Sequence, residues 1–187
     1  MNHFVQFVNT LCPLDESACD DFSNLLNSGI YKKGDHLLKR GSICQNLYFI
    51  DNGLTKTYFN KEEKEFIMRF FPEKTMFTVL DSFLTQTPST YAVMALEPTT
   101  VTYISKTDMD SLCKSHHCIE TFFRKLVSFA SLNMMKRITE MLEENGTDRY
   151  KHFVNENNHL MQRISLGDLA SYLGITQVSL SRIRAKR

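Results

Sequence analysis

The chain has 187 residues, of which 42% are hydrophobic and 23% are charged, and its formal net charge is +1. This composition excludes an intrinsically disordered chain, and the length suffices for one full-sized domain together with a smaller one. No apolar run is long enough to span a membrane, and the N-terminal segment lacks the basic start of a signal peptide. We therefore expect a cytoplasmic protein.

The first half of the chain is expected to be mostly β-structure after a helical start. One helical face is predicted at the N-terminus from Phe4, Phe7, Val8 and Leu11. Short runs rich in β-branched and aromatic residues follow: Ile30–Tyr31, Leu37–Leu38, Leu47–Ile50, Leu54–Phe59, Phe66–Phe71, Tyr91–Ala95 and Val101–Ile104. The strongest turn signal between them is Asn52-Gly53, which predicts a hairpin joining the strands on either side. Many short strands with regular turns are typical of a β-sandwich, jelly roll or barrel.

A long helix is predicted from Ile119 to Glu144, because this stretch has neither Gly nor Pro. One apolar stripe at helical spacing consists of Phe123, Val127, Ala130, Met134, Ile138 and Met141. Further apolar residues occupy other faces, and such a helix cannot bury itself against a single surface. It is either enclosed within one protomer or lies between its own β-domain and a second copy of the chain. We favour the second interpretation, a dimerisation helix.

The region after the long helix carries the most informative pattern. A helix is predicted from Asp148 to Asn155, and residues 159–164 are expected to be an extended lead-in. One apolar helical face then consists of Leu166, Leu169, Ala170 and Leu173. Gly174 follows where the chain must turn, Thr176 offers an N-cap oxygen, and Leu180 with Ile183 gives a second helix its buried face. This is the geometry of a helix-turn-helix whose second helix reads DNA.

An ordinary helix pair packed in a core is the alternative for this motif, and charge distinguishes the two. Between Met161 and Arg187 there are five cations and one acid, Asp168. Four of the five cations lie on or just after the second helix, where phosphates would be met. A helix-turn-helix usually binds two half-sites as a twofold dimer, which also supports the dimerisation helix.

In this order, a β-roll, a long helix and a C-terminal helix-turn-helix resemble the Crp/Fnr family of bacterial transcription regulators, over nearly the whole chain. The motifs that carry the resemblance are the turn Tyr31–Asp35, the strand Leu47–Ile50 followed by Gly53, and residues 170–176 and 180–183. The run Asp148–Tyr150 and the short C-terminus are similar to a short subgroup found in Bacteroidetes-type genomes. The resemblance implies an α+β fold with three parts, namely a cyclic-nucleotide-binding-like β-roll sensor domain (1–118), a dimerisation helix (119–145) and a helix-turn-helix domain (146–187).

The resemblance also implies which residues meet DNA. Base reading falls on Gln177, Val178 and Arg182, with Ser179 nearer the phosphates, and Arg184 and Lys186 add positive charge beside them. Family members often carry Glu where Val178 stands; Val cannot accept a hydrogen bond from cytosine, although it can touch a thymine methyl group. The implied partners are palindromic double-stranded DNA, a second copy of the chain and RNA polymerase.

The chain departs from the family at the effector pocket. Members that bind cyclic nucleotides use a Gly-Glu pair and, further on, an Arg followed by Ser or Thr. Here the corresponding positions hold Thr78 and Val79, then Ser89 and Thr90, so the cation, the acceptor and the glycine are missing. A buried phosphate without its Arg would keep an uncompensated charge, at a cost of several kcal/mol. We therefore predict that cyclic AMP does not bind tightly and that any effector is a different molecule.

Other functions receive less support from the sequence. The five cysteines (Cys12, Cys19, Cys44, Cys113 and Cys118) form no CxxC motif, so neither a zinc finger nor a thioredoxin-like site is predicted. An iron–sulfur or redox sensor using Cys12, Cys19 and a third thiol stays open, but the wide gaps favour free thiols. No metal or cofactor is predicted.

A jelly-roll metalloenzyme would need clustered ligands on its strands, and only His36 of the six histidines lies in the strand region, so no enzyme is predicted. The remaining alternative is a ligand-sensing signalling module whose helix-turn-helix docks a protein. Arg182 and the basic tail favour DNA over that alternative.

Overall fold

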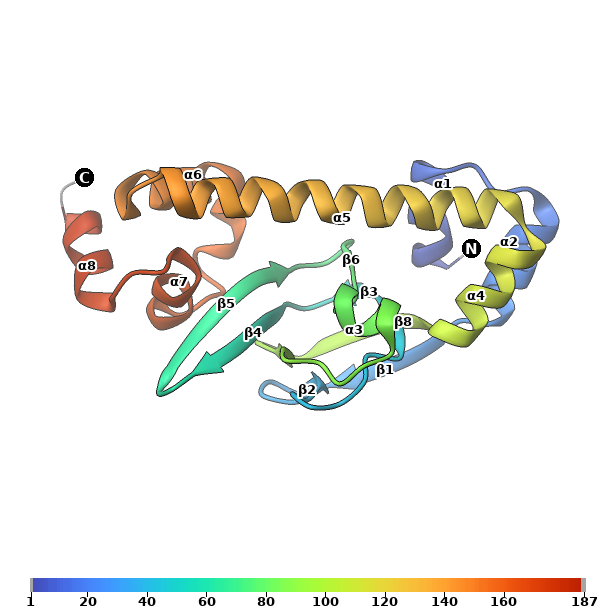
Figure 1. Ribbon diagram of the computed structural model, residues 1–187, viewed down its shortest axis with the longest axis horizontal. Coiled ribbons are helices and arrows are strands. Elements are labelled where there is room, and N and C mark those ends of the chain that lie inside the picture. Colours follow the sequence, from blue (N-terminus) through green and yellow to red (C-terminus); the bar gives the residue numbers. More distant parts are fainter. Residues whose placement is uncertain (1, 186–187) are drawn as a thin grey trace. The chain divides into compact units, whose positions relative to one another are not determined.

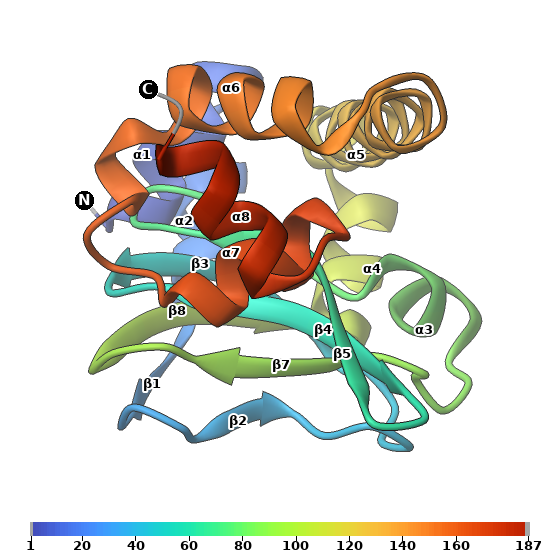
Figure 2. The same cartoon turned by 90° about the vertical axis from the view of Figure 1, so that its left-hand side faces the viewer.

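The structure is a computed structural model that describes residues 2–185 (Figure 1, Figure 2). Its internal contacts divide the chain into two compact units, Met1–Thr57 with Phe70–Ala130, and Tyr58–Arg69 with Ser131–Arg187. The division falls inside a continuous helix, α5 (His117–Glu143). No helix among residues 2–185 has both the length and the apolar character that crossing a membrane requires.

Two four-stranded sheets form the β-roll. The first has the order β1-β8-β3-β6, with the bounds β1 Asn27–Tyr31, β8 Thr99–Ser105, β3 Asn46–Asn52 and β6 Met76–Phe77. The second has the order β2-β7-β4-β5, with the bounds β2 His36–Leu38, β7 Ala92–Ala95, β4 Thr55–Lys61 and β5 Lys64–Phe71. The seven predicted strand runs are confirmed. The short strand β6 was not predicted, because two residues carry no alternating pattern.

The predicted hairpin at Asn52-Gly53 is wrong. β3 pairs with β8 on one edge and β6 on the other, so no edge is left for β4, which lies in the second sheet. The turn therefore carries the chain from one sheet to the other. Gly53 has φ +104°, and a Cβ there would lie 2.7 Å from the carbonyl oxygen of Pro98, so glycine is required both by the dihedral angle and by the close approach.

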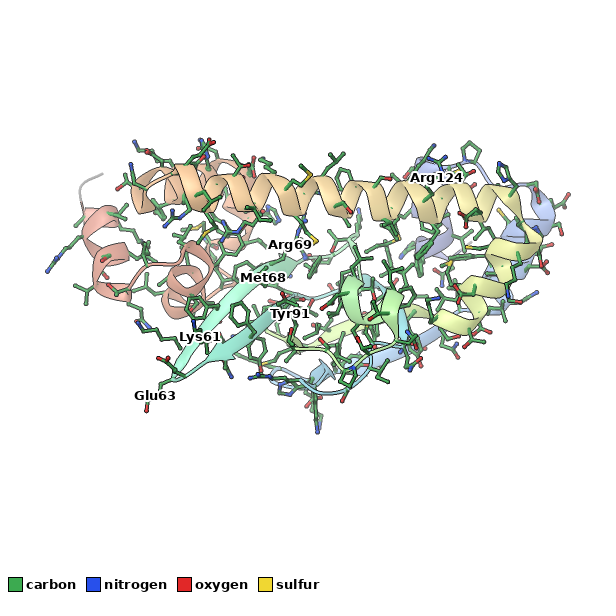
Figure 3. All side chains as sticks on the ribbon, viewed as in Figure 1. Lys61, Glu63, Met68, Arg69, Tyr91 and Arg124 are labelled. Atoms are coloured by element: carbon green, nitrogen blue, oxygen red, sulfur yellow. The ribbon has the colours of Figure 1, made fainter. Side chains whose placement is uncertain are left out.

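The hairpin of the roll joins β4 to β5 instead, through a turn in which Glu62 has φ +56°. Figure 3 shows Lys61 and Glu63 at its tip, with Met68 and Arg69 along β5. Both tip residues are exposed. The turn lacks the Asn-Gly or Asp-Gly pair that makes a hairpin recognisable from sequence, and it was therefore missed.

Two helices precede the strands, one lies between β6 and β7, and one follows β8. Their bounds are α1 His3–Leu11, α2 Glu16–Asn24, α3 Leu80–Thr85 and α4 Lys106–Ser115. The predicted apolar face of α1 is confirmed, except that Leu11 is 40% exposed. The ring of Phe4 stacks on Phe49 of β3 with centroids 5.4 Å apart and meets Phe22 of α2 edge-on, also at 5.4 Å. This aromatic cluster joins the N-terminal helices to the first sheet.

The second unit continues from α5 through four more helical elements. They are α6 Gly146–Asn157, a 3₁₀ turn at Asn158–Leu160, α7 Leu166–Leu173 and α8 Gln177–Ala185. The predicted extended lead-in over residues 159–164 is wrong, because the 3₁₀ turn and further turns occupy it. Leu160 is 1% exposed, so the tight turn places this side chain in the interior. An extended segment would instead point alternate side chains to solvent.

Candidate nucleic-acid interface and effector pocket

The α7–α8 pair is built from local signals in the sequence. Ser165 caps α7 by accepting the amide of Asp168 at 3.0 Å, and Thr176 precedes α8 and accepts the amide of Ser179 at 3.1 Å. Gly174 ends α7 with φ +67° and ψ +29°, the left-handed conformation that L-residues adopt at a cost. The Ile175 amide then bonds the carbonyl of Ala170 at 3.1 Å, which completes a sharp turn between the two helices.

Burial within the pair follows the predicted faces. Leu169, Ala170 and Leu173 of α7 are at most 2% exposed, and Leu180 of α8 is fully buried. Leu166 and Ile183 are half-buried. The pair therefore has its own apolar contact, which leaves the opposite side of α8 in solvent.

The exposed side of α8 carries two of the predicted DNA-binding residues together. Val178 is 60% exposed and Arg182 is exposed, and their spacing of four residues places them on one face, away from Leu180. Arg184 is also exposed, on a different face of the helix. Lys186 lies outside the described residues. Figure 2 shows α8 in front of α7, with one side of the helix uncovered within this unit.

The other two predicted residues make contacts inside the unit. Gln177 leans on α7, since its Nε2 lies 3.0 Å from the position that a Cβ on Gly167 would occupy. Ser179 is half-buried, and its hydroxyl lies 2.9 Å from that of Thr176. Gln177 is nevertheless exposed, so the accessible part of α8 includes its first residues as well as Arg182.

The apolar stripe predicted on α5 has two halves. Phe123, Val127 and Ala130 are half-buried, and Phe123 contacts the ring of Phe83 with centroids 6.2 Å apart. The other half is open: Met134 is 53%, Ile138 57% and Met141 41% exposed. Neighbouring apolar side chains are at least as exposed, namely Leu132 and Met135 at 64% and Leu142 at 80%. Met135, Ile138 and Leu142 follow one another at spacings of three and four residues, the repeat of a helix pair.

The four predicted pocket positions lie around α3, and Thr78 and Ser89 among them make hydrogen bonds within their unit. The hydroxyl of Thr78 donates to the carbonyl of Asn46 at 3.0 Å and lies 3.2 Å from the thiol of Cys44. Val79 is 5% exposed and precedes α3 without capping it. Ser89 is 2% exposed, and its hydroxyl bonds both the amide and the carbonyl of Tyr91, at 2.9 and 3.0 Å. Thr90 is exposed.

Further polar groups connect α3 to the loop that precedes β3, and no sequence pattern had indicated them. The hydroxyl of Ser82 accepts the Cys44 amide at 2.9 Å and donates to the carbonyl of Thr87 at 2.6 Å. The Gln86 amide group donates to the carbonyls of Cys44 at 3.3 Å and Phe83 at 2.8 Å. Cys44 and Ser82 are each 1% exposed. The polar groups of this region therefore bond to one another.

The cysteines and histidines do not gather. All five cysteines are free thiols, and burial together with the nearby Glu120 carboxylate raises the pKa of the Cys113 thiol to about 12. Among residues 2–185 no three His, Cys, Asp or Glu side chains are arranged so that they could hold a metal ion. His116 lies 2.8 Å from the Asp21 carboxylate, which joins α2 to the end of α4.

The β-roll matches a protein family. The model of the cyclic nucleotide-binding domain matches residues 30–116, which include every strand from β2 to β8 and the helices α3 and α4. This part of the chain is therefore similar to cyclic nucleotide-binding domains. A search of the curated proteins finds no match for this chain.

Solved structures extend the likeness of the cyclic nucleotide-binding domain to the rest of the chain. FixK2 from Bradyrhizobium japonicum superposes with a TM-score of 0.77 at 14% identity, covering 86% of this chain and 83% of FixK2. The c-di-GMP-responsive global regulator CLP of Xanthomonas campestris superposes with a TM-score of 0.73 at 15% identity, covering 92% of this chain and 91% of CLP. A putative transcriptional regulator of the Crp/Fnr family from Eubacterium rectale superposes with a TM-score of 0.73 at 15% identity, covering 92% of this chain and 83% of that regulator. The Crp/Fnr resemblance seen in the sequence is confirmed at the level of the fold.

Proposed function

We propose that this protein is a sequence-specific DNA-binding transcription regulator of the Crp/Fnr type, which acts in the cytoplasm and catalyses no reaction. The observation that carries the proposal is the exposed face of α8, where Arg182 and Val178 stand on a helix whose opposite side is anchored by Leu180. Such a helix presents a guanidinium that can bind guanine in a bidentate manner, beside a methyl-bearing side chain that can contact thymine. Arg184 adds a cation suited to a phosphate.

The active species in this proposal is a homodimer formed along α5. Its interface includes the open half of the predicted stripe and the adjoining Met135 and Leu142. Each large apolar side chain that becomes buried contributes about 1.5–3 kcal/mol, and twofold symmetry counts each one twice. Pairing of two chains along α5 gives the protein two reading helices, which a palindromic site requires.

The cyclic nucleotide-binding domain acts in this proposal as a sensor that does not respond to cyclic AMP. A cyclic phosphate needs a cation, and Thr78, Val79, Ser89 and Thr90 offer none. The half-buried hydroxyl of Thr78 and the buried hydroxyl of Ser89 both bond to backbone groups. We therefore expect any effector of this domain to be a molecule whose binding does not require a contact between a phosphate and an arginine.

Selection of bound fragments from genomic DNA tests the proposal, with no effector added. The wild type is compared with Arg182→Ala and with Lys33→Ala, a matched control that removes an exposed cation from the turn after β1. We expect a twofold-symmetric motif with half-sites about one helical turn apart, lost in Arg182→Ala and kept in Lys33→Ala. A wild type that enriches no motif, or an Arg182→Ala variant that enriches the same motif equally, would contradict the proposal.

A further inference from the structure

The C-terminal end of α7 is held by arginines from two other helices. The last four carbonyls of a helix lack intrahelical partners. The guanidinium of Arg137 on α5 donates to the carbonyl of Tyr172, and Nε of Arg149 on α6 donates to the carbonyl of Leu173 at 2.9 Å. Cations at a helix C-terminus also meet its partial negative charge, so these bonds are stronger than neutral ones.

Each arginine is fixed at its own end as well. The Arg137 guanidinium lies 4.0 Å from the centre of the Tyr172 ring and 3.6 Å from the Glu140 carboxylate, and its side chain is only 17% exposed. Arg149 also donates to the carbonyl of Glu144, just beyond the end of α5. A planar guanidinium with several partners has one orientation, unlike the freely turning ammonium of a lysine. The two side chains therefore define an angle between α7 and the C-terminal half of α5.

Apolar packing at the same place leaves little room for another arrangement. A Cβ on Gly174 would lie 2.9 Å from the Cε atom of Met141, so the turn between α7 and α8 rests directly on α5. The Tyr172 ring also meets Phe153 of α6, with centroids 5.1 Å apart. Burial raises the pKa of the Tyr172 phenol, and the cations of Arg137 and Arg69 counteract part of this rise.

We propose that Arg137 and Arg149 are positioning residues, which fix α8 relative to α5 and thereby set the half-site spacing that the dimer accepts. The inference rests on the proposed function. Neither residue needs to touch DNA: α5 of each chain determines where its partner lies, and the arginines determine where each reading helix lies on α5. One base pair more or less rotates a half-site by about a tenth of a turn, which a rigidly held helix cannot follow.

Duplexes carrying the selected motif test this inference, with the spacer at its natural length, one base pair shorter and one longer. Wild type is compared with Arg137→Gln, with Arg137→Lys, and with Lys136→Gln. The last is the matched control, because Lys136 is the neighbouring cation on α5, 58% exposed, and pairs with Glu156 and Glu140. The dimer mass and thermal unfolding of each variant are measured beside the affinities.

We expect wild type and Lys136→Gln to prefer the natural spacing by about tenfold, and Arg137→Gln to reduce this preference to about threefold or less. Arg137→Lys keeps the charge without the planar fork, so its preference should fall between the two. A profile unchanged in Arg137→Gln, or an equal loss of affinity at all three spacings, overturns the inference and leaves the proposed function standing. A wild type that selects no motif overturns both.

Discussion

Polar side chains around α3 bond within their own unit, whereas those on the exposed face of α8 point to solvent. Around α3, the side chains of Thr78, Ser82, Gln86 and Ser89 bond to backbone groups of their own unit. On α8, Arg182 and Arg184 are exposed, and the side-chain bond at the start of the helix is the cap in which Thr176 accepts the amide of Ser179. Hydroxyl and amide groups that bond to their own backbone are not available to a ligand, whereas exposed cations are available to a partner. This difference agrees with the proposed contact of α8 with DNA and with the predicted absence of cyclic AMP binding.

The largest effect is expected from a substitution on α5 that prevents dimerisation, because the proposed DNA binding by α8 requires the dimer. Ile138→Glu would place two charges in an apolar seam, while Ile30→Glu changes an isoleucine that is 83% exposed on β1. We expect Ile138→Glu to be monomeric at micromolar concentration by light scattering and to lose DNA binding, and Ile30→Glu to behave as wild type. A dimeric Ile138→Glu protein would place the interface elsewhere.

Ser82→Ala breaks the inward network around α3, since it leaves the buried Cys44 amide and the Thr87 carbonyl without this hydroxyl. An unsatisfied buried polar group costs about 1–3 kcal/mol, so the free energy of unfolding should fall by that amount in urea denaturation. Ser181→Ala on the exposed side of α8 is the control and should change stability by less than about 0.5 kcal/mol. Equal losses in both variants would show that the comparison is mistaken.

A smaller effect of opposite sign is expected at Thr55 of β4, which is fully buried and whose hydroxyl has no hydrogen-bond partner among residues 2–185. Thr55→Val removes this unpaired group and should be neutral or raise the free energy of unfolding by up to about 1 kcal/mol. Thr102→Val is the counterpart, because its hydroxyl donates to Asp51 at 2.7 Å, and it should be destabilised. A clear loss of stability in Thr55→Val would reveal a bonded hydroxyl.

No effect at all is expected from cyclic AMP. A dissociation constant one hundredfold below the nucleotide concentration would stabilise the protein by about 2.7 kcal/mol and raise Tm by roughly 5 °C or more. Differential scanning calorimetry with millimolar cyclic AMP should show no such rise. A shift of that size would mean that this domain binds the nucleotide without the usual arginine.

The sequence by itself determined the elements whose signals are local. Gly174, Thr176 and Ser165 mark the ends of α7 and α8 through side-chain and backbone preferences that act within a few residues. The seven strand runs were likewise visible, because alternation and β-branching reflect the strand itself. Arg182 and Val178, which the resemblance to the Crp/Fnr family implied as DNA-contacting residues, lie on an exposed face of α8.

Only the tertiary structure decided which elements pair and which side chains meet. Asn52-Gly53 marks a turn, but whether β4 returns along β3 depends on β8 and β6, which already occupy both edges of β3. Arg137 lies 35 residues before Tyr172, and no local pattern says that its guanidinium bonds that carbonyl. The division between units inside α5 was also invisible, because a continuous helix carries no local mark of where its neighbours change. Strand pairing, helix capping by distant side chains and the division into units all depend on contacts between residues far apart in the sequence. Competition among several elements therefore decides them, and the sequence of a single element does not.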